Sequence, residues 1–337
     1  MHLLIAHAAP LGPRCRAALQ QHGKLQLPRL AQLLQRMTPM QQHSGGEQSL
    51  TPLSEKVRAA AAGIDATDGL VPWAALDAIT LKLPGTNAPS LGAGWAWITP
   101  CHWQVNADHV EMLDPAELAL TVQESAALME AMRAYFSEDG ITLYPGSAAT
   151  TATSGASTWL AHGAALKGLP TASLERARGA TVDRWMPRQP QAKPLRRLQN
   201  EMQMLLYTHP LNDARLAAGK TTINSFWASG TGELPEHYKL PAPPWGGVAC
   251  TLNESLRQSN LHDDATTWLQ AWHTLDRTVL ADLLAQPGAM LTLCGEERAH
   301  TFAQEAGPWW QRLQRRFGAP SPAALIGSLT ASPRIPY

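Results

Sequence analysis

Short apolar runs alternate along the chain with longer segments of helical periodicity. An apolar run bounded by glycine or proline predicts a buried strand, and apolar residues spaced three and four apart predict an amphipathic helix. The predicted strands are 3–8, 95–99, 141–144, 223–228 and 289–293. The predicted helices are 15–37, with a break near Gly23 and Pro28, and 54–63, 114–136, 194–207, 265–284 and 309–317. This alternation indicates an α/β fold, doubly wound, with a mainly parallel sheet covered on both faces.

Polar and turn-forming stretches divide these elements. Residues 41–48 read as a loop, 147–158 as a flexible connection rich in small residues, and 235–247 as a proline-rich linker. The last twenty residues of the chain are expected to be loosely held. We expect residues 95–187 to form a smaller α/β domain inserted into a core domain made of 1–94 and 188–337.

The net charge, the apolar stretches and the N-terminus restrict the classes of function that the sequence predicts. Lys plus Arg and Asp plus Glu each total 27, so the chain has no formal net charge and no basic excess of the kind that marks nucleic-acid binders. No apolar stretch approaches the roughly 18 residues that a membrane span needs, and the N-terminus has no basic region typical of a signal peptide. The expected location is the cytoplasm. The four cysteines lie far apart and predict neither a disulfide framework nor a zinc knuckle.

The most informative segment is 200–235, a predicted helix followed by a turn and a strand that ends in a Gly-x-Gly loop. Loops at the carboxyl ends of parallel strands are the usual ligand sites of α/β proteins. Within the segment, polar and small residues recur at a defined spacing: His209, Pro210, Asn212, Arg215, Gly219, Asn224, Trp227, Gly230 and Gly232.

This pattern resembles the archaeal type of cofactor-independent phosphoglycerate mutase, in the alkaline phosphatase superfamily. Residues 101–146, 183–187 and 271–284 resemble further parts of that family in the same order. The resemblance implies a core of alkaline-phosphatase type with a smaller inserted α/β domain. It also implies ligand binding by five residues of the motif: His209, Asn212, Arg215, Asn224 and Trp227.

The whole chain also resembles the RpfE-type proteins of proteobacteria, which belong to a cluster named for the regulation of pathogenicity factors. The segments that carry this resemblance are 99–105, 138–143 and 196–210. It implies a regulatory role.

Mutases of this type use two divalent metals, which several Asp and His ligands hold at strand ends. Where the family has an Asp-Gly after the first strand, this chain has Ala6-His7-Ala8, and after the last strand it has Gly295-Glu296. The candidates that remain are His7, His262 and Glu296, which do not make two ligand sets. We therefore expect no metal and no cofactor, or Mn²⁺ or Zn²⁺ if the protein is active.

Hydroxyl residues stand where the family places its nucleophile, at Ser49, Thr51 and Ser54. Without a metal or base to activate them, these hydroxyls are expected to cap a helix or close a loop. A second cluster, Cys101, His102, Asp108 and His109, contains possible zinc ligands, but adjacent residues of an extended chain point to opposite sides, which favours a structural role.

Arg196, Arg197 and Arg215 could bind an anion, since a guanidinium suits phosphate or carboxylate, or they could serve as solvated or structural residues. The leading hypothesis is a catalytically degenerate, mutase-like regulatory protein that binds an anionic metabolite or a protein partner. One alternative is an active metal-dependent mutase or phosphatase with a rearranged site at His7, His262 and Glu296. Another is a protein-binding adaptor that uses Trp309 and Trp310 and the basic helix they begin. Neither nucleic acid nor membrane is an expected partner.

Overall fold

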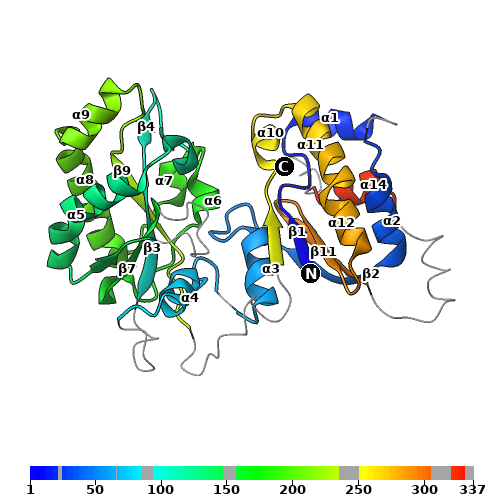
Figure 1. Cartoon of the computed structure of the whole chain (residues 1–337), viewed down its shortest axis with the longest axis horizontal. Helices are drawn as coiled ribbons and strands as arrows, with labels where there is room; N and C mark the ends of the chain where they lie inside the picture. Colours follow the sequence, from blue (N-terminus) through cyan, green and yellow to red (C-terminus); the bar gives the residue numbers. More distant parts are fainter. Residues whose placement is uncertain are drawn as a thin grey trace, which may run out of the picture. The chain divides into compact units, whose positions relative to one another are not determined.

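The chain folds into two compact units in a computed structural model (Figure 1). The structure describes residues 1–21, 25–65, 67–84, 94–146, 157–234, 250–304 and 320–330. Unit 1 consists of Met1–Gln48, Pro52–Ile64 and Leu240–Tyr337, and unit 2 of Ser49–Thr51 and Asp65–Lys239. The predictions for most of 147–158, for the linker 235–247 and for the helix 309–317 lie outside the described residues.

Unit 1 contains a mixed sheet whose described strands follow the order β10, β1, β11, β12, β2. The bounds of these strands are β1 His2–Ile5, β2 Thr38–Ser44, β10 Cys250–Asn253, β11 Met290–Cys294 and β12 Arg298–Ala303. Strand β1 pairs in parallel with β10 and with β11, whereas β12 runs antiparallel to both β11 and β2. Strand β1 therefore lies between two parallel neighbours.

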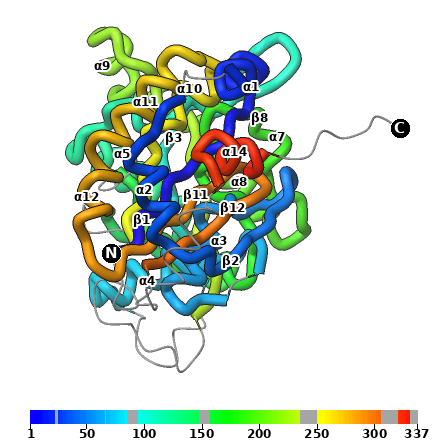
Figure 2. The backbone as a smooth tube through the Cα atoms, turned by 90° about the vertical axis from the view of Figure 1, so that its right-hand side faces the viewer, coloured from blue at the N-terminus to red at the C-terminus, as the bar shows by residue number. Residues whose placement is uncertain are grey.

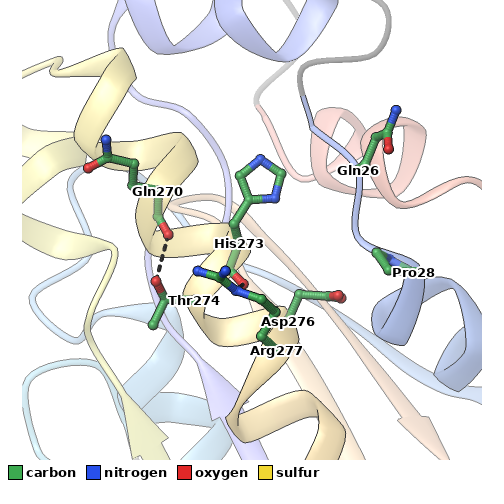
Figure 3. Close-up of a pocket in the computed structure, with 7 residues that line it drawn as sticks. All are labelled: Gln26, Pro28, Gln270, His273, Thr274, Asp276 and Arg277. Atoms are coloured by element: carbon green, nitrogen blue, oxygen red, sulfur yellow. Dashed lines mark hydrogen bonds between the residues drawn. The ribbon is translucent and has the colours of Figure 1, made fainter.

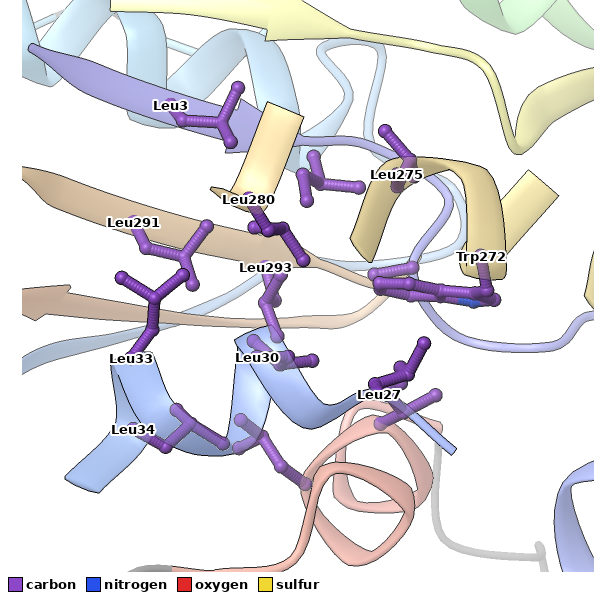
Figure 4. Packing of buried hydrophobic residues seen from close by; sticks show 14 of the residues in the cluster. Leu3, Leu27, Leu30, Leu33, Leu34, Trp272, Leu275, Leu280, Leu291 and Leu293 are labelled. Atoms are coloured by element: carbon purple, nitrogen blue, oxygen red, sulfur yellow. The ribbon is translucent and has the colours of Figure 1, made fainter. Parts of the chain in front are cut away.

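Helices cover both faces of this sheet. Their bounds are α1 Pro13–Gln20, α2 Pro28–Arg36, α3 Leu53–Ala61, α10 Arg257–Leu261, α11 Ala265–Arg277, α12 Val279–Ala285 and α14 Pro322–Ser328. Leu3 and Ile5 of β1 pack in one core with residues of α1, α2, α11, α12 and α14 (Figure 4). Leu4 and Ala6 point to the other side, where they pack with α3. Helices α2, α12 and α14 lie in front of the strands in Figure 2.

Unit 2 is built on an antiparallel sheet. Its described strands follow the order β6, β7, β3, β9, with bounds β3 Trp95–Cys101, β6 Thr142–Tyr144, β7 Trp159–His162 and β9 Ser225–Ser229. The long helices α5 (Val122–Glu138) and α8 (Lys193–Tyr207) bury Leu128, Phe136 and Met202 against it. The capping box predicted at Thr121 and Glu124 is confirmed at the start of α5.

Shorter elements complete unit 2. They are α4 Trp73–Thr80, α6 Leu174–Ala177, α7 Val182–Trp185, α9 Pro210–Ala217, a small sheet of β4 Trp103–Val105, β5 Val110–Met112 and β8 Ala180–Thr181, and the 3₁₀ turns Pro115–Leu118, Ala164–Leu166 and Pro190–Ala192. None of the helices among the described residues is long and apolar enough to cross a bilayer.

Three predictions from the sequence are wrong. The strand pairings are mixed rather than mainly parallel: among the described strands the parallel ladders are those that join β1 to β10 and to β11. Short hairpin turns such as the one between β11 and β12 require antiparallel neighbours. Residues 41–44 belong to strand β2 instead of a loop. The end of the chain is not loosely held throughout, since α14 buries Leu325 and Ile326 in the core of unit 1.

The boundary between the units also differs from the expected one. We expected an inserted domain at 95–187, but the second compact unit also takes in α4 on one side and α8, α9 and β9 on the other. The physical reason is that β9 pairs along its whole length with β3. The segment 200–235, which carries the motif, therefore belongs to unit 2, not to the unit that holds the parallel strands.

Candidate functional site

The carboxyl ends of the parallel strands in unit 1 are the first place to look for a ligand site. His7 follows β1 after one residue, Glu254 follows β10 directly, and Glu296 lies two residues after β11. Because β10, β1 and β11 are neighbours and run in the same direction, these three residues belong to one edge of the sheet. Of the three, only His7 and Glu296 were predicted.

His7 and Glu254 lie close together at this edge. A ring nitrogen of His7 and a carboxylate oxygen of Glu254 are within 4.8 Å of each other. His7 has a left-handed backbone with φ of 55°, which is uncommon for a residue with a Cβ and often marks a constrained loop. The pair offers one imidazole and one carboxylate, which could bind one cation or exchange a proton.

Asn260 fixes the loop that carries His7. Its side chain is 1% exposed, and its Nδ2 donates to the carbonyl oxygens of His7 at 2.9 Å and Ala9 at 2.6 Å. Its Oδ1 accepts a hydrogen bond from the backbone N–H of Leu11 at 2.8 Å. One buried amide thus holds the loop after β1 at three points.

The other two predicted ligands do not join His7. His262 is exposed at the end of α10, and Glu296 is exposed in the tight turn that leads from β11 into β12. In the described part of the chain, His7, His262 and Glu296 do not form a three-residue ligand group. The reason is topological, since β11 returns at once as an antiparallel hairpin and leaves no long loop to place a ligand over the sheet edge.

Two aspartates of unit 1 cap helices that are distant from them in sequence. Asp263 accepts the backbone N–H groups of Arg14 and Cys15 at the start of α1, each at 2.9 Å. Asp276, 2% exposed, accepts those of Arg29 at 3.2 Å and Leu30 at 2.9 Å at the start of α2. The N-termini of both helices, which would otherwise attract an anionic ligand, are thereby satisfied within unit 1.

The motif residue Arg215 is a buried structural residue of unit 2. Its side chain is 2% exposed and donates from Nε to Thr221 O at 2.7 Å, from one terminal nitrogen to Leu118 O at 2.6 Å, and from the other to Glu124 Oε1 at 2.8 Å. Although burial alone would raise the pKa of Glu124, hydrogen bonds from Thr121 and Arg215 hold that pKa below its ordinary value. The guanidinium therefore faces a carboxylate of the protein itself.

The other predicted ligand-binding residues are also engaged within unit 2. Asn212 donates to Leu206 O at 2.8 Å and Ile223 O at 2.7 Å and accepts from Ile223 N at 2.9 Å. Asn224 exchanges two hydrogen bonds with the backbone of Trp103, at 2.7 and 2.9 Å. Trp227 donates from Nε1 to Ala172 O at 2.8 Å, and His209 caps α9 by accepting from Leu211 N at 3.1 Å. These bonds give the motif a structural role, and ligand binding by its residues stays a prediction.

The backbone conformation or close backbone packing explains the presence of glycine at three positions of the motif. Gly219 and Gly230 have φ of 67° and 70°, in the left-handed region that glycine adopts without strain. A Cβ at Gly232 would lie 1.9 Å from the carbonyl oxygen of Leu70. The Gly-x-Gly loop thus allows two backbone segments of unit 2 to approach closely.

The candidate nucleophiles close a loop. In unit 2, Ser49 Oγ donates to Asp68 Oδ1, and Asp68 also accepts the backbone N–H groups of Leu50 at 2.9 Å and Thr51 at 3.1 Å. Thr51 Oγ1 in turn accepts from Gly69 N at 2.8 Å. The carboxylate of Asp68 thus ties these three residues into one closed loop. Ser54 is buried in the first turn of α3, in unit 1.

Residues of the cluster between Cys101 and His109 likewise form hydrogen bonds within unit 2. His102 Nδ1 lies 2.9 Å from Thr222 O, and the two ring nitrogens of His109 lie 2.6 Å from Asp108 Oδ1 and 3.1 Å from Asn106 Nδ2. Burial raises the pKa of the Cys101 thiol, which opposes the thiolate that zinc requires. These residues do not form a three-residue ligand group within the part of unit 2 that the structure describes.

Arg196 and Arg197 also form hydrogen bonds or ion pairs with other residues of the chain. Arg196 donates to Pro187 O at 2.7 Å. Arg197 pairs with Asp139 at 2.7 Å and Glu201 at 2.5 Å, which explains why its pKa lies above the ordinary value. Both arginines serve the surface of α8 rather than a pocket.

Sequence reasoning missed Glu254 and Asp68. Strand β10 was not predicted because it has only four residues, is little buried and is adjacent to the proline-rich stretch. Glu254 was therefore not recognised as a residue at the end of a strand. For Asp68 the available signal was the dipeptide Asp68-Gly69, which is typical of a turn.

Comparisons with known proteins find similarity in structure only. No family model matches the chain, and no curated protein matches it. The PH0037 protein from Pyrococcus horikoshii is similar over 91% of this chain and 87% of its own, with 12% identity and a TM-score of 0.46. A cofactor-independent phosphoglycerate mutase from Thermoplasma acidophilum is similar over 90% of each chain, with 13% identity and a TM-score of 0.33. Similarity at this level assigns no activity to this chain.

Proposed function

We propose that this chain is a mutase-like regulatory protein that binds an anionic metabolite and does not carry out two-metal phosphoryl transfer. The observation that carries the proposal is the composition of the strand edge in unit 1. Among the described residues of unit 1, His7 contributes one imidazole and Glu254 one carboxylate to this edge. Two divalent cations carry four positive charges and need several carboxylate and imidazole ligands, so these residues do not fit a two-metal centre.

The environment of the candidate nucleophiles supports the same proposal. Attack on a phosphoryl group requires a hydroxyl that a metal or a strong base deprotonates. Ser49 donates its hydroxyl hydrogen to Asp68, which is occupied in closing the loop, and Thr51 accepts a backbone bond. Their geometry suits a loop closure better than nucleophilic attack.

Activity measurements test the proposal directly. Purified protein is assayed for phosphoglycerate mutase and for phosphatase activity with added Mn²⁺, Zn²⁺ or Co²⁺. We expect rates indistinguishable from the buffer blank. Robust turnover that disappears on chelation would overturn the proposal.

A second candidate, an active enzyme with a rearranged single-metal site, draws on the proximity of His7 and Glu254. It predicts stoichiometric metal in the purified protein by elemental analysis, lost in a His7→Ala variant. The matched control is His262→Ala, because His262 is exposed at the end of α10. Metal content that is absent, or equal in both variants, excludes this candidate.

A further inference from the structure

A pocket opens on the helix layer of unit 1, away from the strand edge described above. Its volume is about 680 Å³, and α11 and the segment leading into α2 line it (Figure 3). Pockets of about 300–1,000 Å³ are the usual size for small-molecule ligands. The volume is therefore that of a site for a metabolite.

One wall of the pocket is a polar face of α11. Gln270, His273, Thr274 and Arg277 follow the spacing i, i+3, i+4 and i+7, which places them on one side of the helix. The opposite side of α11 carries Trp268, Trp272 and Leu275, which are buried in the core of unit 1. The core therefore fixes the orientation of α11, and the polar face of the helix lines the pocket.

The second wall is the chain that enters α2, with Gln26 and Pro28. Asp276 joins the two walls, since its carboxylate accepts the backbone N–H groups of Arg29 and Leu30 at the start of α2. These bonds hold the walls at a fixed separation. They also set the negative charge of Asp276 against the positive end of α2, so this carboxylate does not repel an anion as an isolated one would.

Arg277 is the cationic side chain of the lining, opposite in sign to the carboxylate of Asp276. Its Nε donates to the backbone carbonyl oxygen of His273 at 3.3 Å, which restrains the guanidinium at the last turn of α11. Within the described residues, no acidic side chain pairs with Arg277. The amides of Gln26 and Gln270 add neutral donors to this lining.

We propose that this pocket binds a small organic anion through its carboxylate or phosphate oxygens, with Arg277 as the charged anchor. A guanidinium presents a planar fork that matches both kinds of oxyanion, and a glutamine amide can donate to either. The inference rests on the proposed function, to which it adds a location for the anionic metabolite. This location is separate from His7 and Glu254 and from the motif of unit 2.

Calorimetric titration tests the site. The probes are succinate and inorganic phosphate, with glycerol as a neutral control, and each is titrated into the full chain and into Arg277→Gln and Gln270→Trp variants. We expect succinate or phosphate, but not glycerol, to bind the unmodified protein. Removal of the guanidinium is expected to weaken binding about tenfold or more, because a charge-assisted hydrogen bond is lost, and the tryptophan is expected to block the cavity. The matched control is Arg36→Gln, which removes an exposed arginine from the last turn of α2.

The outcomes separate this inference from the proposed function. Binding that survives in both Arg277→Gln and Gln270→Trp would overturn the location and leave the proposed function standing. Absence of binding by both anions would overturn the inference, while the mutase and phosphatase assays would still decide the catalytic part of the proposal. An equal loss of affinity in Arg36→Gln would show a general charge effect and would also overturn the site.

Discussion

The guanidinium of Arg215 donates three hydrogen bonds that join α9 to the start of α5 and to the 3₁₀ turn before it. In an Arg215→Met variant, Glu124 and two carbonyl groups lose their partner in a place where the arginine is 2% exposed. We expect unit 2 to lose about 3–5 kcal/mol of unfolding free energy, the usual cost of breaking one side of a buried pair. Urea denaturation followed by tryptophan fluorescence measures the change.

An exposed pair supplies the control for Arg215. Arg133 pairs with Glu130 at 2.8 Å on the surface of α5, and its side chain is 44% exposed. Arg133→Met should change the unfolding free energy by no more than about 0.5 kcal/mol. Similar small losses in both variants would mean that Arg215 is not structural, and would favour the predicted ligand role instead.

Substitution of two glycines of the same motif distinguishes the cost of backbone strain from the cost of steric overlap. Gly219 has φ of 67° and open space around it, so Gly219→Ala should cost about 1 kcal/mol. Gly232→Ala places a Cβ 1.9 Å from Leu70 O, and the required shift of backbone should cost about 2–3 kcal/mol. Denaturation midpoints of the two variants measure the difference, and equal losses would contradict the close approach at Gly232.

At the level of elements, a line of polar side chains crosses four strands of the sheet in unit 1. His2 Nε2 lies 2.7 Å from Thr292 Oγ1, Thr292 Oγ1 lies 2.8 Å from Thr301 Oγ1, and Thr301 Oγ1 lies 3.5 Å from His43 Nε2. Burial, with the charges of the N-terminus and His43, lowers the pKa of His2, and burial lowers the pKa of His43. Both histidines are therefore held in the neutral form at neutral pH.

The pH dependence of stability follows from these lowered pKa values. A histidine with a lowered folded-state pKa stabilises the fold above its unfolded pKa of about 6.5, and this contribution is lost as the pH falls towards the folded-state value. Unfolding free energy should therefore decrease between neutral and mildly acidic pH. In a His2→Asn variant the decrease should be smaller, whereas the exposed His262→Asn control should keep it. Urea denaturation at several pH values measures the slope, and an unchanged slope in His2→Asn would contradict the assignment.

The elements that the sequence predicted are those with enough apolar residues to show a period. Helix α2 and strand β11 were predicted because their apolar residues face one core. Residues 41–44 of strand β2, whose sequence is Thr-Pro-Met-Gln-Gln-His-Ser, were predicted to be part of a loop because the strand lies at the sheet edge and most of it is exposed. The motif of 200–235 was found from its spacing, but its partners Glu124, Leu118 and Trp103 are about one hundred residues away, so local sequence could not reveal its structural role.

At the scale of the whole molecule, the division into units depends on one pairing between distant strands. From the sequence alone, β3 and β9 were assigned to different domains, because more than one hundred residues separate them. The register of β3 with β9 runs from Trp97 with Ser229 to Cys101 with Ser225 and places both in unit 2. Helix α8 follows the same division, since Leu198 and Met202 pack in the core of α5 and this sheet.

Isolated fragments test this division. A fragment of residues 65–239 contains all four described strands of the antiparallel sheet and both long helices, α5 and α8, so it retains the core that they bury. It should fold cooperatively, with dispersed amide resonances and a single urea transition, although loss of Ser49–Thr51 removes the partners of Asp68 and should lower its stability. A fragment of residues 95–187, the insertion expected from the sequence, lacks β9 and α8. One edge of β3 then has no partner strand and α8 is missing from the helix layer. The fragment should therefore remain unfolded by the same measures. If the shorter fragment folds and the longer one does not, the boundary lies where the sequence suggested and the division into these two units is wrong.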